Sequence, residues 1–184
     1  MARSSLLSSL REDHVNAARL LDLLTREAQM IRDGDDVDYD VIEGVLDYFT
    51  GYPDAFHHPL EDQVLNRLLA VDPDRAAAIG DLLADHARMR RDTADLFTTL
   101  KGVRLEAEIP RDTLLQKLDS FVEMYRAHMA AEEDRFFPLA EEVLGAVDWA
   151  AVRQSLEERA DPLFSGKEGF QGLRKRLLAF ENNL

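Results

Sequence analysis

The chain has 184 residues, enough for one domain with a buried core, and its 36 acidic and 22 basic residues give a formal net charge of −14. So negative a surface argues against a nucleic-acid ligand, which needs positive charge to displace counterions, and against an anionic membrane surface. The absence of cysteine from the sequence excludes disulfides, thiolate metal sites and cysteine nucleophiles.

The first predicted helix is long and amphipathic. Apolar residues recur at helical spacing between Leu6 and Leu24. The segment 33–36, Asp-Gly-Asp-Asp, is typical of a helix end, because glycine readily adopts the left-handed backbone conformation that closes many helices. We therefore expect one continuous helix over this part of the chain.

A second helix is predicted from near Asp38, with apolar positions continuing as far as Leu68. Two prolines, Pro53 and Pro59, lie inside it. Because proline lacks a backbone donor and clashes with the preceding turn, we expect this helix to be kinked or interrupted close to His57.

The third and fourth helices follow the same pattern. Asp72-Pro73 is typical of a cap followed by proline at the first helical position, and the third helix runs to about Gly102. The fourth helix begins near Pro110 and ends within 138–145. A short fifth helix begins at 148–149, 161–166 predicts a loop, and a last amphipathic segment covers about 169–180.

Long helices joined by short connections predict an all-α fold, an up-down-up-down four-helix bundle at about 4–145 with a short C-terminal helical extension at about 148–184. No β pattern appears in the sequence. No linker rich in Gly, Pro or Ser divides the chain, so we expect residues 1–184 to form a single domain.

The most informative feature is an internal repeat that contains four of the five histidines. Asp13-His14 recurs as Asp85-His86. A His-x-x-x-Glu pair also occurs twice, and its two copies are separated by nearly the same number of residues. The two pairs are His57 with Glu61 and His128 with Glu132. A repeated helical hairpin with these residues is what a two-metal site on a pseudo-twofold axis requires.

The spacing of the repeat suits metal binding. Residues four apart share one face of a helix, so each His-x-x-x-Glu pair can point at one ion, and a glutamate can bridge two ions with its two oxygens. The candidate ligands are His14, His57, Glu61, His86, His128 and Glu132. Mixed imidazole and carboxylate donors favour iron, with manganese or zinc as alternatives, and six donors shared by two ions leave positions open.

Other interpretations stay open. A single histidine on an apolar face is usually a core residue, and a metal-free bundle is the alternative to the whole site. Against it, four unpaired imidazoles and two carboxylates are costly to bury. His58 and Asp62 form a rival pair; the repeat disfavours it, because His58 aligns with Met129, so we expect His58 either to support a ligand from behind or to face solvent.

Three further side chains near the motifs have two interpretations each. Asp13 and Asp85 either orient the ligand histidines or are plain surface charges. Tyr125 either approaches the metal or is a core tyrosine. We expect Glu133, next to Glu132, to be solvated.

These residues resemble the hemerythrin-like, or HHE cation-binding, family over roughly residues 5 to 145. The resemblance rests on His14, on the segments 56–62 (FHHPLED) and 85–86 (DH), and on 128–138 (HMAAEEDRFFP). It implies a four-helix bundle with a non-haem di-iron centre bridged by the two glutamates. It places the six candidate ligands named above at the metals, with two iron ions as the cofactor.

One departure from the family pattern is informative. Oxygen-carrying hemerythrins have a second histidine one turn after the third-helix ligand, and here that position is Arg90. The chain is therefore more similar to the bacterial hemerythrin-like proteins linked to nitric oxide or peroxide stress, iron-centre repair and iron sensing.

Two classes of function follow. In one, the centre binds or reacts with dioxygen, peroxide or nitric oxide; in the other, the chain senses, holds or donates iron without turnover, so whether it is an enzyme stays open. We expect a small diatomic or peroxide ligand, no nucleic acid and no membrane, and leave a protein partner or a homo-oligomer open. Because no segment is apolar enough for a signal peptide or a membrane span, we expect a cytoplasmic protein.

Overall fold

The computed structural model describes residues 2–105, 110–154, 161–164 and 170–183, and this part of the chain is helical with no strand. Its helices, in chain order, are α1 (Ala2–Asp33), α2 (Tyr39–Tyr52), α3 (His58–Val71), α4 (Pro73–Ala77), α5 (Leu82–Arg104), α6 (Arg111–Ala131), α7 (Phe137–Val143), α8 (Ala146–Gln154) and α9 (Gln171–Glu181). Two π-helical turns, η1 (Pro53–His57) and η2 (Glu132–Phe136), connect α2 to α3 and α6 to α7.

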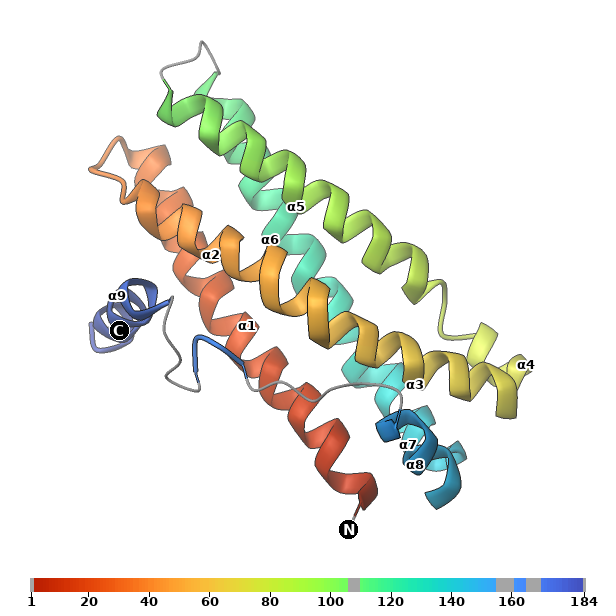
Figure 1. The fold of residues 1–184 in the computed structure, drawn as a ribbon. Helices are drawn as coiled ribbons and strands as arrows, with labels where there is room; N and C mark the ends of the chain where they lie inside the picture. The colour runs from red at the N-terminus through yellow and green to blue at the C-terminus, as the bar shows by residue number, and fades with distance from the viewer. Residues whose placement is uncertain (1, 106–109, 155–160, 165–169, 184) are drawn as a thin grey trace.

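The long helices form a helical bundle (Figure 1). The first rod is α1, the second is α2 continued through η1 into α3, the third is α5, and the fourth is α6 continued through η2 into α7. Helix α1 packs against α2 and α6, and α5 packs against the same two helices from the other side. The bundle therefore has an interior to which all four rods contribute.

Aspartates cap three of the helices. The Asp38 carboxylate accepts hydrogen bonds from two backbone N–H groups at the start of α2. Asp72 and Asp81 accept from the Arg75 and Ala84 N–H groups at the starts of α4 and α5. These contacts satisfy donors that a helix start leaves free. The cap at Asp72 and the start of a helix near Asp38 agree with the prediction from sequence.

The third rod differs from the prediction of one helix from Pro73 to about Gly102. The short helix α4 ends at Ala77, and α5 begins only at Leu82. Gly80, between them, has a φ of +108°, a conformation that lies outside the helical region and that glycine adopts without steric cost. The break at Gly80 therefore lets the chain turn before Asp81 caps α5.

The interruption predicted near His57 is present as the π-helical turn η1. There the His58 N–H donates five residues back to the Pro53 carbonyl, and Pro59 follows directly. The fourth rod has the same kind of turn, which was not predicted from the sequence: the Phe137 N–H donates to the Glu132 carbonyl just before Pro138. Each π-helical turn contains one residue more than an α-helical turn. It lies where a proline, which has no backbone N–H, cannot donate an α-helical hydrogen bond.

Two apolar clusters fill the bundle on either side of a polar layer. One contains residues 17–31 of α1 with buried side chains of α2, α5 and α6. The other contains residues 6–10 of α1 with side chains of α3, α7 and α8, including Trp149. On each rod, the predicted ligands lie between the residues of the first cluster and those of the second.

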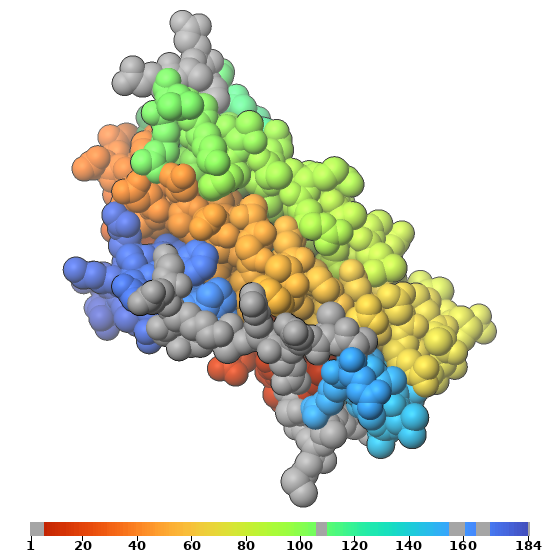
Figure 2. Space-filling model, viewed as in Figure 1, coloured from red at the N-terminus to blue at the C-terminus, as the bar shows by residue number. Residues whose placement is uncertain are grey.

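The C-terminal part of the chain covers the outside of the bundle. Helix α9 packs on α1 and α2, and Figure 2 shows it against that face. Its Leu177 is buried, and its Glu181 pairs with Arg19 at 2.6 and 2.9 Å. Asp161 accepts a hydrogen bond from the Tyr48 hydroxyl (2.8 Å) and begins a turn at 161–164; the rest of the predicted loop, 165–166, lies outside the described residues.

The described helices include none with the length and apolar character needed to cross a membrane.

Candidate metal centre

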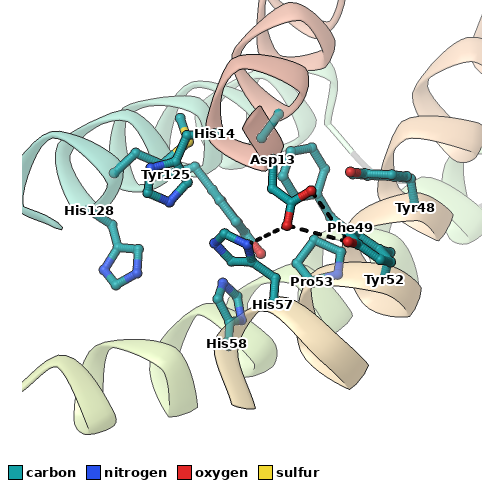
Figure 3. A pocket seen from close by; sticks show the side chains of 12 residues that line it. Asp13, His14, Tyr48, Phe49, Tyr52, Pro53, His57, His58, Tyr125 and His128 are labelled. Atoms are coloured by element: carbon teal, nitrogen blue, oxygen red, sulfur yellow. Dashed lines mark hydrogen bonds and ion pairs between the residues drawn. The ribbon is translucent and has the colours of Figure 1, made fainter. Parts of the chain in front are cut away.

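The six predicted ligands meet in the polar layer of the bundle. Their side chains come from all four rods, and each is buried: His14, His57, Glu61, His86, His128 and Glu132. Figure 3 shows His14, His57 and His128 entering one space from three rods. Three of them are almost completely enclosed, with exposed fractions of 1% for Glu61, 1% for His86 and 0% for Glu132.

One group of donors surrounds the Oε1 atom of Glu61. The Nε2 atom of His57 lies 3.2 Å from this oxygen, and the Nε2 atom of His14 lies 3.5 Å from it. His14 Nε2 is also 3.4 Å from Glu132 Oε2. Two imidazoles and one oxygen from each glutamate therefore converge on this side of the layer.

A second group surrounds the other oxygens of the same two glutamates. The Nε2 atoms of His86 and His128 are 3.0 Å apart, and His128 Nε2 is 3.1 Å from Glu132 Oε1. His86 Nε2 lies 3.5 Å from both Glu132 Oε1 and Glu61 Oε2. Each glutamate thus presents one oxygen to each group, which is the arrangement of a bridging carboxylate.

The buried atoms of this layer have a chemistry that fits metal ions. His14 Nε2 and all four oxygens of Glu61 and Glu132 form no hydrogen bond of acceptable geometry within the described residues, although ring nitrogens surround them. Buried carboxylate oxygens without partners are costly. Two donor atoms that each lie about 2.1 Å from one ion, at right angles to each other, are about 3 Å apart. The distances between ring nitrogens and carboxylate oxygens in this layer are close to that value.

Acidic side chains hold the outer ring nitrogen of three predicted ligands. The Nδ1 atom of His14 lies 3.0 Å from Glu133, and that of His57 lies 3.0 Å from Asp13. The Nδ1 atom of His86 lies 2.7 Å from Asp62. A carboxylate at Nδ1 keeps the proton there and leaves the Nε2 lone pair free for a metal. The three rings are therefore oriented as ligands.

The repeat predicts some of these partners but not all. Asp13 orients His57 and not its own neighbour His14, whereas Asp85 pairs with Arg88 on the surface. The expectation that Glu133 is solvated holds only in part, because its side chain is 33% exposed but contacts His14 Nδ1 and Arg11. A signal was present in the sequence: Asp62 and Glu133 directly follow the two glutamates predicted as ligands, one in each copy of the repeat.

The repeat symmetry fails at His128. Its Nδ1 atom is buried and has no hydrogen-bond partner among the described residues. Asp85, which corresponds to Asp13 in the other copy, is the residue that would occupy this place, and it lies on the surface with Arg88 instead.

His58 does not face solvent, which corrects one of the two expectations for it. It is 2% exposed, and its ring stacks on that of His86 with centroids 4.4 Å apart. Its Nδ1 atom lies 3.1 Å from Asp54. One donor atom from each of His58, Glu61, His86 and His128 lies within 4.8 Å of the others.

The charged groups of the layer shift one another's proton affinities. Burial lowers the pKa of His14, but contacts with Glu132 and Glu61 outweigh it and raise the pKa to about 9. The pKa of His86 is also raised to about 9, by Asp62 and Glu132 against the effect of burial. Burial and Glu61 raise the pKa of Glu132, yet the surrounding histidines lower it to about 2. Without metal, these shifts favour His14 and His86 as imidazolium groups and Glu132 as a carboxylate near neutral pH.

A small cavity of about 20 Å³ borders the layer, which is room for about one water molecule. Histidines, Tyr52 and Tyr125 are among its lining residues (Figure 3). Tyr125 is 2% exposed, and burial raises the pKa of its hydroxyl. Tyr125 therefore lies in the core and also faces the candidate site, so that both interpretations of it stand.

Comparisons with known proteins agree with this geometry. A family model described as the hemerythrin HHE cation-binding domain matches residues 5–140. Uncharacterized proteins of Mycobacterium bovis and of two strains of Mycobacterium tuberculosis are each 25% identical to the chain over 129 residues. The aligned region covers 70% of this chain and 50% of each relative, so the chain spans about half the length of these curated relatives. No solved structure matches the chain significantly.

Proposed function

The chain belongs to the hemerythrin HHE cation-binding family, and from this premise we propose that it binds two iron ions at a carboxylate-bridged centre that reacts with a small oxidant. The ligands we propose are His14 and His57 for one ion and His86 and His128 for the other, with Glu61 and Glu132 bridging both. We further propose that residues 1–184 form one domain whose four rods alternate in direction.

The observation that carries this proposal is the state of the two glutamates. Their four carboxylate oxygens are buried and have no hydrogen-bond partner in the part of the chain that the structure describes, and each glutamate has one oxygen beside each group of histidines. A single ion would leave two of these oxygens without a partner. Two ions satisfy all four, and they neutralise the two carboxylates in a layer that apolar clusters enclose.

Iron is the metal that the donor set favours. Imidazole suits iron and zinc, whereas carboxylate suits the harder ions, so a mixed set of nitrogen and oxygen donors fits iron, with manganese or zinc less favoured. Iron bound there would supply one-electron redox chemistry and open positions for an exogenous ligand. Dioxygen, peroxide and nitric oxide are the ligands we propose, because the adjoining cavity has room for about one water molecule.

The chain's own residues would perform three tasks at this centre. Glu133, Asp13 and Asp62 keep the proton on Nδ1 and so hold each Nε2 lone pair toward the ions. The apolar clusters on both sides limit the access of water. The narrow cavity excludes organic substrates of ordinary size, so the site acts on small molecules.

An iron-holding or iron-sensing module without turnover is the second candidate function. The burial of all six ligands favours it, because an enclosed centre exchanges both metal and ligand slowly. The two candidates share the same metal site and differ only in whether the bound iron cycles repeatedly between oxidation states.

Visible absorption spectra of the iron-loaded protein before and after addition of peroxide test the proposal. Repeated, rapid consumption of excess peroxide that is lost in Glu132→Ala supports a reactive centre. Oxidation by one equivalent and no further consumption supports the holding module. In protein supplied with excess ferrous iron, a spectrum that shows no absorption from bound ferric iron after peroxide is added would contradict both.

A further inference from the structure

His58 is the one histidine that the six-ligand site does not use. It lies in the same polar layer as the ligands, it is 2% exposed, and it comes directly after His57 in the second rod. Figure 3 shows the rings of His57 and His58 entering the same space from adjacent positions. A buried imidazole at this place needs partners for both of its nitrogens.

The outer nitrogen of His58 has the same kind of partner as the ligands. Its Nδ1 lies 3.1 Å from the Asp54 carboxylate, as the Nδ1 atoms of His14, His57 and His86 lie beside Glu133, Asp13 and Asp62. An acidic partner at Nδ1 fixes the proton there and leaves the Nε2 lone pair free. His58 is therefore prepared in the same way as the three oriented ligands.

The inner nitrogen of His58 belongs with the second group of donors. A donor atom of His58 lies within 4.8 Å of donor atoms of Glu61, His86 and His128. Because Nδ1 faces Asp54, the atom available to the group is Nε2. The ring stacks on His86 with an interplanar angle of 16° and meets His128 edge to face, so the three imidazoles are close neighbours.

The π-helical turn explains how adjacent residues serve different groups. Neighbours in an α-helix point about 100° apart, so two successive side chains seldom share a buried site. The turn η1 ends at His57, and α3 begins at His58. His57 contacts Asp13 and Glu61 Oε1 on one side of the layer, whereas His58 contacts Asp54 and His86 on the other.

We propose that His58 Nε2 is a ligand of the ion held by His86 and His128, an inference that rests on the proposed two-metal centre. That ion then has three imidazoles and one oxygen of each glutamate, five donors in all. The ion at His14 and His57 has two imidazoles and two oxygens, four donors. The two ions are therefore unequal, and a small exogenous ligand binds preferentially at the ion of His14 and His57.

Cobalt(II) binding to the full chain after chelator treatment tests this assignment, with a chromophoric competitor for the affinities and visible absorption for the coordination. The wild-type chain should bind two cobalt ions. His58→Phe keeps a buried ring against His86 but removes the nitrogen. It should lower the affinity of the chain for one of the two cobalt ions by more than about 100-fold. This loss is larger than the about 10- to 100-fold that removal of an orienting partner causes.

Asp54→Asn is the matched control. It keeps His58 Nε2 and removes only the charge at Nδ1, so its loss of affinity should stay within about 10- to 100-fold. Circular dichroism of the metal-free variants checks that each is folded, and His58→Leu replaces His58→Phe if the larger ring does not fit. His58→Phe or His58→Leu binding two cobalt ions with wild-type affinities would overturn the role of His58 and leave the two-metal centre intact. A wild-type chain that binds fewer than two cobalt ions would overturn the two-metal centre and the role of His58 with it.

Discussion

At the scale of single residues, Glu61 and Glu132 are the side chains least compatible with a metal-free bundle. Both are almost completely buried in one layer, and the charge of Glu61 raises the pKa of Glu132 and so opposes its ionisation. Taking each carboxylate out of water costs several kcal/mol unless partners compensate it. In the proposed centre that compensation comes from two metal ions together with the surrounding imidazoles.

The bridging role of the glutamates predicts equal effects from the two copies of the repeat. Glu61→Ala and Glu132→Ala should each reduce the occupancy of both ions, because each removes one oxygen from both. Metal analysis of the purified variants measures this. Glu123→Ala, an exposed site on the same helix as His128, should keep both ions. Loss of one ion only in either glutamate variant would show that the residue is not a bridge.

The two aspartates that precede the lone histidines provide a sharper comparison. Asp13 supports His57, whereas Asp85 pairs with Arg88 on the surface. Asp13→Asn should therefore weaken metal binding by about 10- to 100-fold, and Asp85→Asn should not. Competition with a chelator measures both affinities. Equal losses in the two variants would mean that the repeat, and not the observed contact, decides which aspartate matters.

The sequence predicts the candidate ligands better than it predicts their supporting residues. The His-x-x-x-Glu spacing is a property of one helix, so it is visible in the chain itself. The pairing of Asp62 with His86 and of Glu133 with His14 joins different helices, and it depends on how the rods pack. The repeat disfavours His58 as a ligand because His58 aligns with Met129, but this alignment carries no information about the contacts that His58 makes with other helices.

At the scale of elements, local signals predict the helices, and tertiary packing decides their interruptions. The caps at Asp38 and Asp72 and the disturbance near His57 follow from residue type. The break at Gly80 and the turn η2 were not predicted. A glycine in the sequence does not show whether its φ is helical or positive, as it is at Gly80. A π-helical hydrogen bond such as the one in η2 has no characteristic residue pattern.

Helix α9 stabilises the bundle from outside without contributing a predicted ligand. Leu177 is fully buried and Leu178 is 44% exposed, so these neighbours are a matched pair. Leu177→Ala should lower the free energy of unfolding by about 2–5 kcal/mol. Leu178→Ala should change it by less than about 0.5 kcal/mol. Denaturant unfolding of the metal-loaded variants measures this, and metal content should be unchanged in both; loss of metal in Leu177→Ala would show that α9 also shapes the site.

At the scale of the whole molecule, the ionised layer makes the stability of the metal-free protein depend on pH. His14 and His86 have pKa values raised from 6.5 to about 9 in the folded chain, so their stabilisation is complete below pH 6.5 and is lost as the pH rises through 9. The pKa of Glu132 is lowered from 4.5 to about 2, so its contribution is present above pH 4.5 and is lost as the pH falls through 2.

The chelator-treated protein should therefore melt at lower temperatures as the pH rises from 6.5 toward 9 and above. The metal-loaded protein should not show the decline between pH 6.5 and 9, because its imidazoles are neutral ligands in both conditions. Thermal melts over this range measure both curves. Parallel curves with and without metal would contradict the assignment of His14 and His86 to the metal site.

The central claim is that four rods of one chain enclose two metal ions. Elemental analysis of protein expressed with sufficient iron, combined with an accurate protein concentration, tests it most directly. We expect two iron ions per chain, and none after treatment with a strong chelator. One zinc ion per chain, or no metal at all in iron-replete protein, would contradict it.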